Sequence, residues 1–116
     1  MQQQTVTDLT FLKKFCENDP ARINKYINLF LTSAVGFRQK MTTALQTQNW
    51  NELANQAHSF RSTATMMGMS NSKKLLAKVE EDCRRDNITG TIAVEVEVVL
   101  NELTIAENEL GALVKQ

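Results

Sequence analysis

The chain has 116 residues, 42% of them hydrophobic and 22% charged, which is typical of one folded globular domain over residues 1–116. Its 13 basic and 13 acidic residues give a formal net charge of zero, so no long-range field draws the chain to nucleic acid or to an anionic membrane. The first residues lack the basic and apolar stretches of a signal peptide, and no apolar run approaches the length of a membrane span. These features predict a cytoplasmic protein, with Cys16 and Cys83 as reduced core thiols.

Helix breakers are rare, since the chain has one proline and four glycines, and this favours long helices over many short strands. A short helical segment is expected after Thr7-Asp8. Asp19 followed by Pro20 is typical of an N-cap with proline at the first helical position, and the helix that follows is predicted to reach about Gln46. Its apolar residues recur at steps of three and four: Ile23, Ile27, Phe30, Ala34, Phe37, Met41 and Ala44.

A third helix is predicted to begin at Asn49, which with Glu52 forms an Asx variant of the capping box, and to end at Gly68. Ser70 is expected to cap a fourth helix, which is broken between Asn87 and Gly90. The apolar positions of these two helices are Trp50, Leu53, Ala57, Phe60, Ala64 and Met67, and then Leu75, Leu76, Val79 and Cys83.

The last segment carries two conflicting patterns. Residues 94–98 alternate between valine and glutamate, which by itself is typical of a strand. Over the longer window the apolar residues keep a four-three rhythm and no second strand is available for pairing, so a helix is predicted. Short connections make consecutive helices antiparallel neighbours. The predicted fold is therefore all-α: an antiparallel up-down-up-down four-helix bundle with a short extra N-terminal helix.

The chain contains one histidine, His58, in the third predicted helix. At about 100° per residue, the apolar stripe of that helix is centred about 130° away, so the imidazole is expected to point to solvent. A lone histidine on a helix is most often only a solvated side chain. One histidine cannot build a metal site, and no acid is in local register to orient the ring as in a nucleophile triad. However, residues 59–65 include several short side chains that are poor formers of helix interiors, which indicates selection for small size.

The segment from Ala57 to Gly68 resembles the signature of the histidine-containing phosphotransfer (HPt) family. That signature is a histidine, any residue, an apolar residue, lysine or arginine, a small residue, and later an apolar residue followed by glycine. The turns at Asp8-Leu9, Asp19-Pro20 and Asn49-Trp50 are also similar to the family, so the resemblance covers nearly the whole chain. The places of the signature are filled by His58, Phe60, Arg61, Ser62, Met67 and Gly68.

The resemblance implies a phosphocarrier and not an enzyme. His58 would take a phosphoryl group from an aspartyl phosphate on one receiver domain and pass it to an aspartate on another, in response regulators and hybrid sensor kinases. Arg61, where lysine is commoner, would screen the phosphoryl charge, and Ser62, where glycine is commoner, would leave room beside the imidazole. Partner docking is expected on the exposed sides of the second and third helices, at an apolar centre with a polar rim that includes Asn55, Gln56 and Thr65.

No metal or cofactor of the chain's own is expected, and Mg²⁺ is expected on the partner receiver domain, because the bundle offers no carboxylate cluster around its imidazole. A monomer is expected, and the start at Met1 favours a free-standing protein over a domain excised from a larger kinase. The alternative function is a non-catalytic helical adaptor that binds a receiver domain or a kinase. A ligand-binding or metal-binding bundle is least favoured, because no polar residues break the core stripes.

Overall fold

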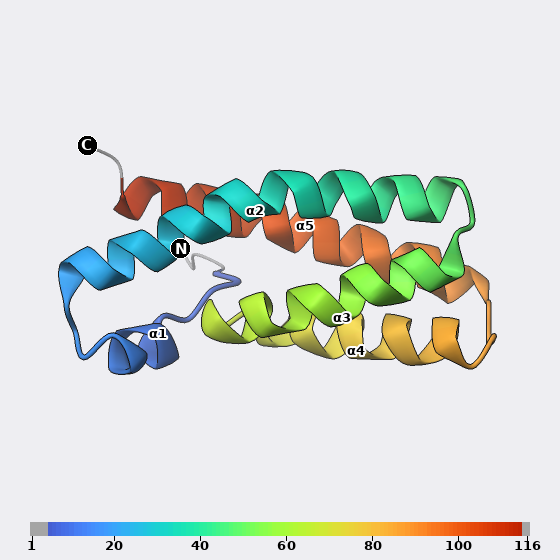
Figure 1. Ribbon diagram of the computed structural model, residues 1–116, viewed down its shortest axis with the longest axis horizontal. Helices are drawn as coiled ribbons and strands as arrows, with labels where there is room; N and C mark the ends of the chain where they lie inside the picture. The colour runs from blue at the N-terminus through green and yellow to red at the C-terminus, as the bar shows by residue number, and fades with distance from the viewer. Residues whose placement is uncertain (1–4, 115–116) are drawn as a thin grey trace.

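The computed structural model describes residues 5–114, and within this range the chain forms five helices and no strand. The helices of the bundle run alternately up and down, and α2 and α4 each pack against both α3 and α5 (Figure 1). The predicted all-α bundle with a short leading helix is therefore confirmed. None of the described helices combines the length and hydrophobicity needed to cross a bilayer. The helices are α1 (Thr10–Phe15), α2 (Pro20–Gln46), α3 (Trp50–Met66), α4 (Ser70–Arg84) and α5 (Gly90–Leu113).

The expectation that the chain lacks an export signal concerns Met1 to Gln4, which lie outside the described residues. Residues 115 and 116, the last two of the predicted single domain, also lie outside the described residues.

The predicted caps of α2 and α3 are both formed. The Asp19 side chain accepts a hydrogen bond from the Ala21 amide (3.1 Å), and the Asn49 side chain accepts one from the Glu52 amide (3.1 Å). The reciprocal half of the capping box is not made, because the Asn49 amide donates to the Ala44 carbonyl (2.9 Å). Each cap satisfies one of the amides that the first helical turn leaves without an intrahelical partner.

The predicted cap of α4 is wrong. The N-cap residue is Met69, which makes no side-chain capping bond, and Ser70 is already the first helical residue. Met69 is fully buried and its amide donates to the Ala64 carbonyl (2.8 Å). Burial of the methionine side chain therefore outweighs the local preference for a serine cap, and the helix begins one residue earlier than expected.

The core is built from the predicted apolar stripes. Phe60 of α3 stacks on Phe37 of α2 with ring centroids 3.9 Å apart and meets Phe30 at 6.1 Å, which joins the two helices. Cys16 and Cys83 are free and buried, as expected for core thiols. The buried stripe residues are Ile27, Phe30, Ala34, Phe37, Met41 and Ala44 on α2, Leu53, Ala57, Phe60 and Ala64 on α3, and Ile92, Val96, Val99, Leu103, Ala106 and Leu110 on α5.

Burial along α5 follows the helical rhythm and not the strand-like alternation at its start. Val96 is fully buried and Val98 is half-buried, whereas Val94 is largely exposed. The buried residues recur at steps of four and three because that stripe faces α2 and α4.

The N-terminal segment ties the ends of two helices together. The Thr7 amide and hydroxyl both donate to one oxygen of Glu109 on α5 (3.2 and 2.6 Å), and the Asp8 amide donates to the Met67 carbonyl at the end of α3 (3.0 Å). Gly68 lies next to this crossing with φ of +69°, and a Cβ there would overlap the Asp8 backbone. Gly68 therefore ends α3 for a conformational and a steric reason.

Gly68→Ala is expected to lower the free energy of unfolding by at least about 2 kcal/mol, because the new Cβ adds strain at positive φ and displaces Asp8. Urea unfolding followed by circular dichroism measures this change. Gly36→Ala is the matched control, since a Cβ there meets open space within α2 and should stabilise the protein by about 0.5–1 kcal/mol. Equal effects of the two substitutions would contradict the role of Gly68.

Candidate functional site

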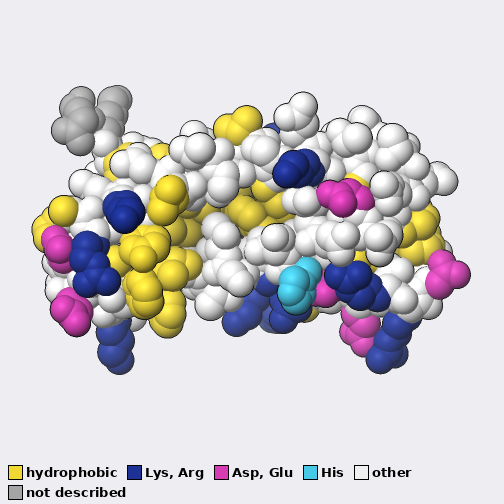
Figure 2. Space-filling view, in the orientation of Figure 1, with side chains coloured by type: hydrophobic (Ala, Val, Ile, Leu, Met, Phe, Trp, Pro, Cys, Tyr) yellow, Lys and Arg dark blue, Asp and Glu magenta, His cyan; other side chains and the backbone are white. Residues whose placement is uncertain are grey.

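The chain's one histidine stands on the outer surface of α3, and 66% of its side chain is exposed (Figure 2). The solvent-facing imidazole predicted from the helical register is confirmed. Figure 2 shows hydrophobic side chains gathered along the seam between α2 and α3 and over the α1 end of this face. The histidine itself lies among polar and charged side chains, so its surroundings favour contact with a charged or hydrated group.

A glutamate from the neighbouring helix contacts the imidazole. His58 Nδ1 lies 3.0 Å from Glu80 Oε2, and Glu80 retains only 14% of its side-chain exposure. No acid in local register was expected to orient the ring, and the acid that does so stands 22 positions away on α4, where local spacing gives no indication of it. The two helices pack closely together, and Ala54 and Ala57 near the histidine on α3 are small and fully buried.

Two arginines share the same carboxylate. Arg61 Nη1 donates to Glu80 Oε1 (2.9 Å), and Arg84 Nε donates to Glu80 Oε2 (3.2 Å). Burial by itself raises the pKa of the Glu80 carboxyl. The hydrogen bonds from Arg61 and Arg84, together with nearby His58, outweigh burial, so the pKa lies below its ordinary value of 4.5. Glu80 is therefore ionised at neutral pH.

The ionised carboxylate determines which nitrogen of the imidazole carries the hydrogen. A carboxylate can only accept hydrogen bonds, so Nδ1 of His58 must donate to Glu80. In the neutral ring the other nitrogen, Nε2, then keeps its lone pair. The geometry thus presents a nucleophilic nitrogen at an exposed position, with a negative charge behind the ring.

The two other residues predicted beside the histidine are both at the site. Arg61 is 39% exposed, but it is held against Glu80 and its Nε is buried without a hydrogen-bond partner in the described structure. Ser62 is exposed one helical turn after His58. Arg61 therefore supplies positive charge from a fixed position, and Ser62 leaves space on the side that faces α2.

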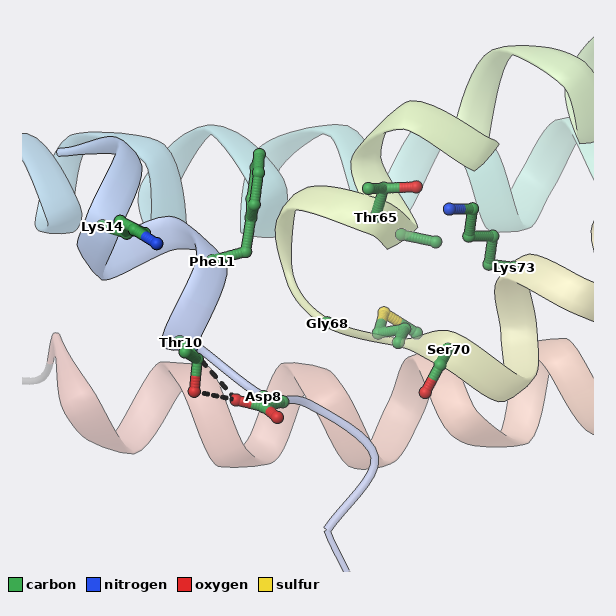
Figure 3. A pocket seen from close by; sticks show the side chains of 10 residues that line it. Asp8, Thr10, Phe11, Lys14, Thr65, Gly68, Ser70 and Lys73 are labelled. Atoms are coloured by element: carbon green, nitrogen blue, oxygen red, sulfur yellow. Dashed lines mark hydrogen bonds between the residues drawn. The ribbon is translucent and has the colours of Figure 1, made fainter.

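The predicted edge residues do not lie together. Asn55 is exposed and accepts a hydrogen bond from Arg84 Nη2 (3.1 Å), while Gln56 is half-buried and donates to Glu52 (2.8 Å). Thr65 lines a different cavity, between α1, the end of α3 and the start of α4 (Figure 3). Its hydroxyl donates to the Arg61 carbonyl (2.9 Å). Gln56 and Thr65 thus face different neighbouring helices.

A shallow groove runs between α2 and α3 beside the histidine. Ser59 and Gln56 line one part of it opposite Gly36, and Ser62 lines the continuation opposite Leu29. Leu29 is 55% exposed, so the groove offers apolar surface next to small polar side chains. This arrangement suits contact with a protein partner on the α2–α3 side.

Within residues 5–114 no group of three or more histidine, cysteine, aspartate or glutamate side chains is arranged to hold a metal ion. The expectation that the chain binds no metal of its own stays a prediction.

Comparison with known proteins agrees with this geometry. The family model of the Hpt domain matches residues 25–113. The crystal structure of histidine-containing phosphotransfer protein B (HptB) from Pseudomonas aeruginosa PAO1 superimposes with a TM-score of 0.85 at 18% sequence identity, over 97% of each chain. At this identity the likeness shows a shared fold. A search of the curated proteins found no match.

Glu80→Ala is expected to lower the free energy of unfolding at pH 7 by about 1–2 kcal/mol, because Arg61 and Arg84 lose their shared acceptor. The folded-state pKa of Glu80 is lowered, so this contribution is present above pH 4.5 and is lost as the pH falls through the lowered value. Chemical unfolding at several pH values measures the difference between wild type and variant.

The control is Glu81→Ala, which removes an exposed glutamate whose partner on the same helix is Arg85 (3.2 Å). It should change stability by less than about 0.5 kcal/mol. A Glu80→Ala effect that does not shrink at low pH would contradict the proposed pairing.

Proposed function

Because this chain belongs to the Hpt domain family, the histidine phosphotransfer proteins of two-component phosphorelays, we propose that His58 is the residue that carries the phosphoryl group. The single observation that supports this most strongly is that the only histidine of the chain lies within the matched region and has a 66% exposed side chain, while its Nδ1 contacts Glu80. A phosphoacceptor must be reachable by a second protein, and this position meets that requirement.

In the forward step, Nε2 of His58 attacks the phosphorus of an aspartyl phosphate on a receiver domain. The P–O bond to the aspartate breaks, its carboxylate leaves with the bonding electrons, and a P–N bond forms. Positive charge grows on the ring as Nε2 bonds to phosphorus, and the Glu80 carboxylate at Nδ1 stabilises that charge. Transfer to the next receiver reverses these bond changes.

Phosphoryl transfer depends mainly on positioning and on neutralising charge. We assign Mg²⁺ to the receiver domain, because the described surface around His58 offers arginines and no carboxylate cluster. Arg61 would screen the phosphoryl charge from the position in which Glu80 holds it. The domain would thus act as a carrier whose partners supply the catalytic groups.

The proposed docking face is the α2–α3 side, where Ser62 and Leu29 line a groove and Ser62 stands one helical turn after the exposed His58. Gln56, which lines the groove, and the exposed Asn55 on the α4 side of α3 would lie at its edge, whereas Thr65 would contact only a partner that also reaches α1. The partners are receiver domains of response regulators and hybrid sensor kinases. The proposed carrier would act as a monomer in the cytoplasm.

The second candidate is a helical adaptor that binds a receiver or a kinase without chemistry. Exposed apolar surface at Leu29 serves an adaptor equally well, but an adaptor gives no reason for an oriented, nucleophilic imidazole.

His58→Gln should abolish phosphate acceptance and leave the fold intact, because the side chain is exposed. Intact mass, measured after mixing with Mg²⁺ and phosphorylated receiver domains of the same organism, should show one acid-labile phosphate on the wild type and none on the variant. A phosphate that persists on the variant would exclude His58 as the acceptor. Receiver binding by the wild type without any phosphate would favour the adaptor.

Ser62→Leu should weaken receiver binding at least about tenfold, because a larger side chain beside the imidazole obstructs a close-fitting interface. Isothermal titration with the receiver that phosphorylates the wild type measures this. Asn101→Leu, at an exposed position on α5, is the control and should leave the affinity unchanged. Equal affinities of wild type and Ser62→Leu would exclude the α2–α3 side as the docking face.

A further inference from the structure

Arg84 is a second cation at the histidine, and it comes from α4. Its Nε donates to the same Glu80 oxygen that contacts His58 Nδ1, at 3.2 Å. Its Nη2 donates to Asn55 Oδ1 at 3.1 Å, and Asn55 lies on α3 one turn before the histidine. The guanidinium therefore extends from α4 to the α3 surface immediately beside the imidazole.

The two bonds that hold Arg84 are weak enough to be exchanged. Asn55 is a neutral and exposed acceptor. The pair between Arg84 and Glu80 is an i,i+4 contact in which the Arg84 side chain is 43% exposed, and solvent weakens pairs of this kind. A phosphoryl group with a charge of about −2 is a much stronger acceptor, and guanidinium bonds to phosphate are short and often bidentate.

A phosphoryl group on Nε2 would lie within reach of this guanidinium. Side chains three positions apart on a helix have Cβ atoms about 5–6 Å apart, so the Arg84 group at Asn55 is already about one helical turn from the ring. Arg61 is less free to move, because its Nε is buried and its Nη1 is committed to the other Glu80 oxygen. Glu80 would keep Arg61 and the imidazole in place while Arg84 moves.

We propose that Arg84 exchanges Asn55 for the phosphoryl group when His58 is phosphorylated, and that this contact stabilises the phosphohistidine. This inference rests on the proposed function, since it requires a phosphoryl group on His58. It gives α4 a direct part in phosphoryl storage, although the docking face lies on the α2–α3 side.

The contact should slow loss of the phosphoryl group to water. Hydrolysis breaks the P–Nε2 bond, the bonding electrons return to Nε2 as its lone pair, and water supplies the new oxygen and two protons of the inorganic phosphate. In the loose transition state, electrons leave with the ring and the departing phosphoryl group carries less negative charge than it does in phosphohistidine. A guanidinium paired with the phosphoryl oxygens therefore stabilises the ground state more than the transition state.

The test uses the full chain and phosphoramidate, a small donor that phosphorylates histidine without protein docking. After the donor is removed, intact mass follows the half-life of phosphohistidine at pH 7, and ³¹P NMR follows the titration of the phosphoryl group. Arg84→Ala should shorten the half-life about fivefold. It should also raise the second pKa of the phosphoryl group, because a nearby guanidinium favours the dianion. Arg84→Lys should partly restore both the half-life of phosphohistidine and the second pKa of the phosphoryl group.

Arg85→Ala is the matched control, because it removes the adjacent arginine, whose partner is Glu81 and not the site. Changes in Arg84→Ala that are absent from Arg85→Ala would support the proposal. An unchanged half-life and phosphoryl titration in Arg84→Ala, or equal changes in both variants, would overturn it. If the wild type takes up no phosphate on His58, either from phosphoramidate or from any receiver, the proposed function itself is wrong. That failure is distinguishable from a failure of the Arg84 proposal, in which the wild type is phosphorylated and Arg84→Ala has no specific effect.

Discussion

The Glu80 carboxylate is the interaction on which the site depends. It is largely withdrawn from water, and a buried charge must be paired and hydrogen-bonded to be tolerated. Its two oxygens meet that condition by accepting hydrogen bonds from His58, Arg61 and Arg84. The same requirement that stabilises the carboxylate therefore fixes the tautomer of the imidazole and places two positive charges beside it.

That network is possible because α3 and α4 pack closely. Long side chains on α4 reach the outer surface of α3 at this packed interface, where Glu80 contacts His58 and Arg84 contacts Asn55. The two neighbours of α3, α2 and α4, therefore both contribute to the surroundings of His58. The α2–α3 side carries the groove of the proposed docking face, and the α4 side supplies the acid and one of the two arginines. The proposed phosphocarrier would need little more, because its partners would bring the remaining catalytic groups.

The end of α3 is held by contacts that lie far from the histidine. Asp8 bonds to the carbonyl of Met67, and Gly68 makes room for the crossing backbone. The stacked rings of Phe37 and Phe60 fasten the middle of the same helix to α2. The helix that carries the imidazole is thus restrained along its length, and a rigid support keeps a reactive nitrogen correctly oriented for an incoming partner.

The sequence by itself determined which residues of each helix face the core, because burial in a helix follows local spacing. The stripes of α2, α3 and α5, the caps at Asp19 and Asn49, and the exposure of His58 were all predictable for this reason. Only the tertiary structure decided what lies opposite each face. Glu80 and Arg84 are more than twenty positions from His58, and no local pattern indicates that α4 would bring them there. Helical periodicity is a property of one segment, whereas contact between segments depends on how all their side chains pack together.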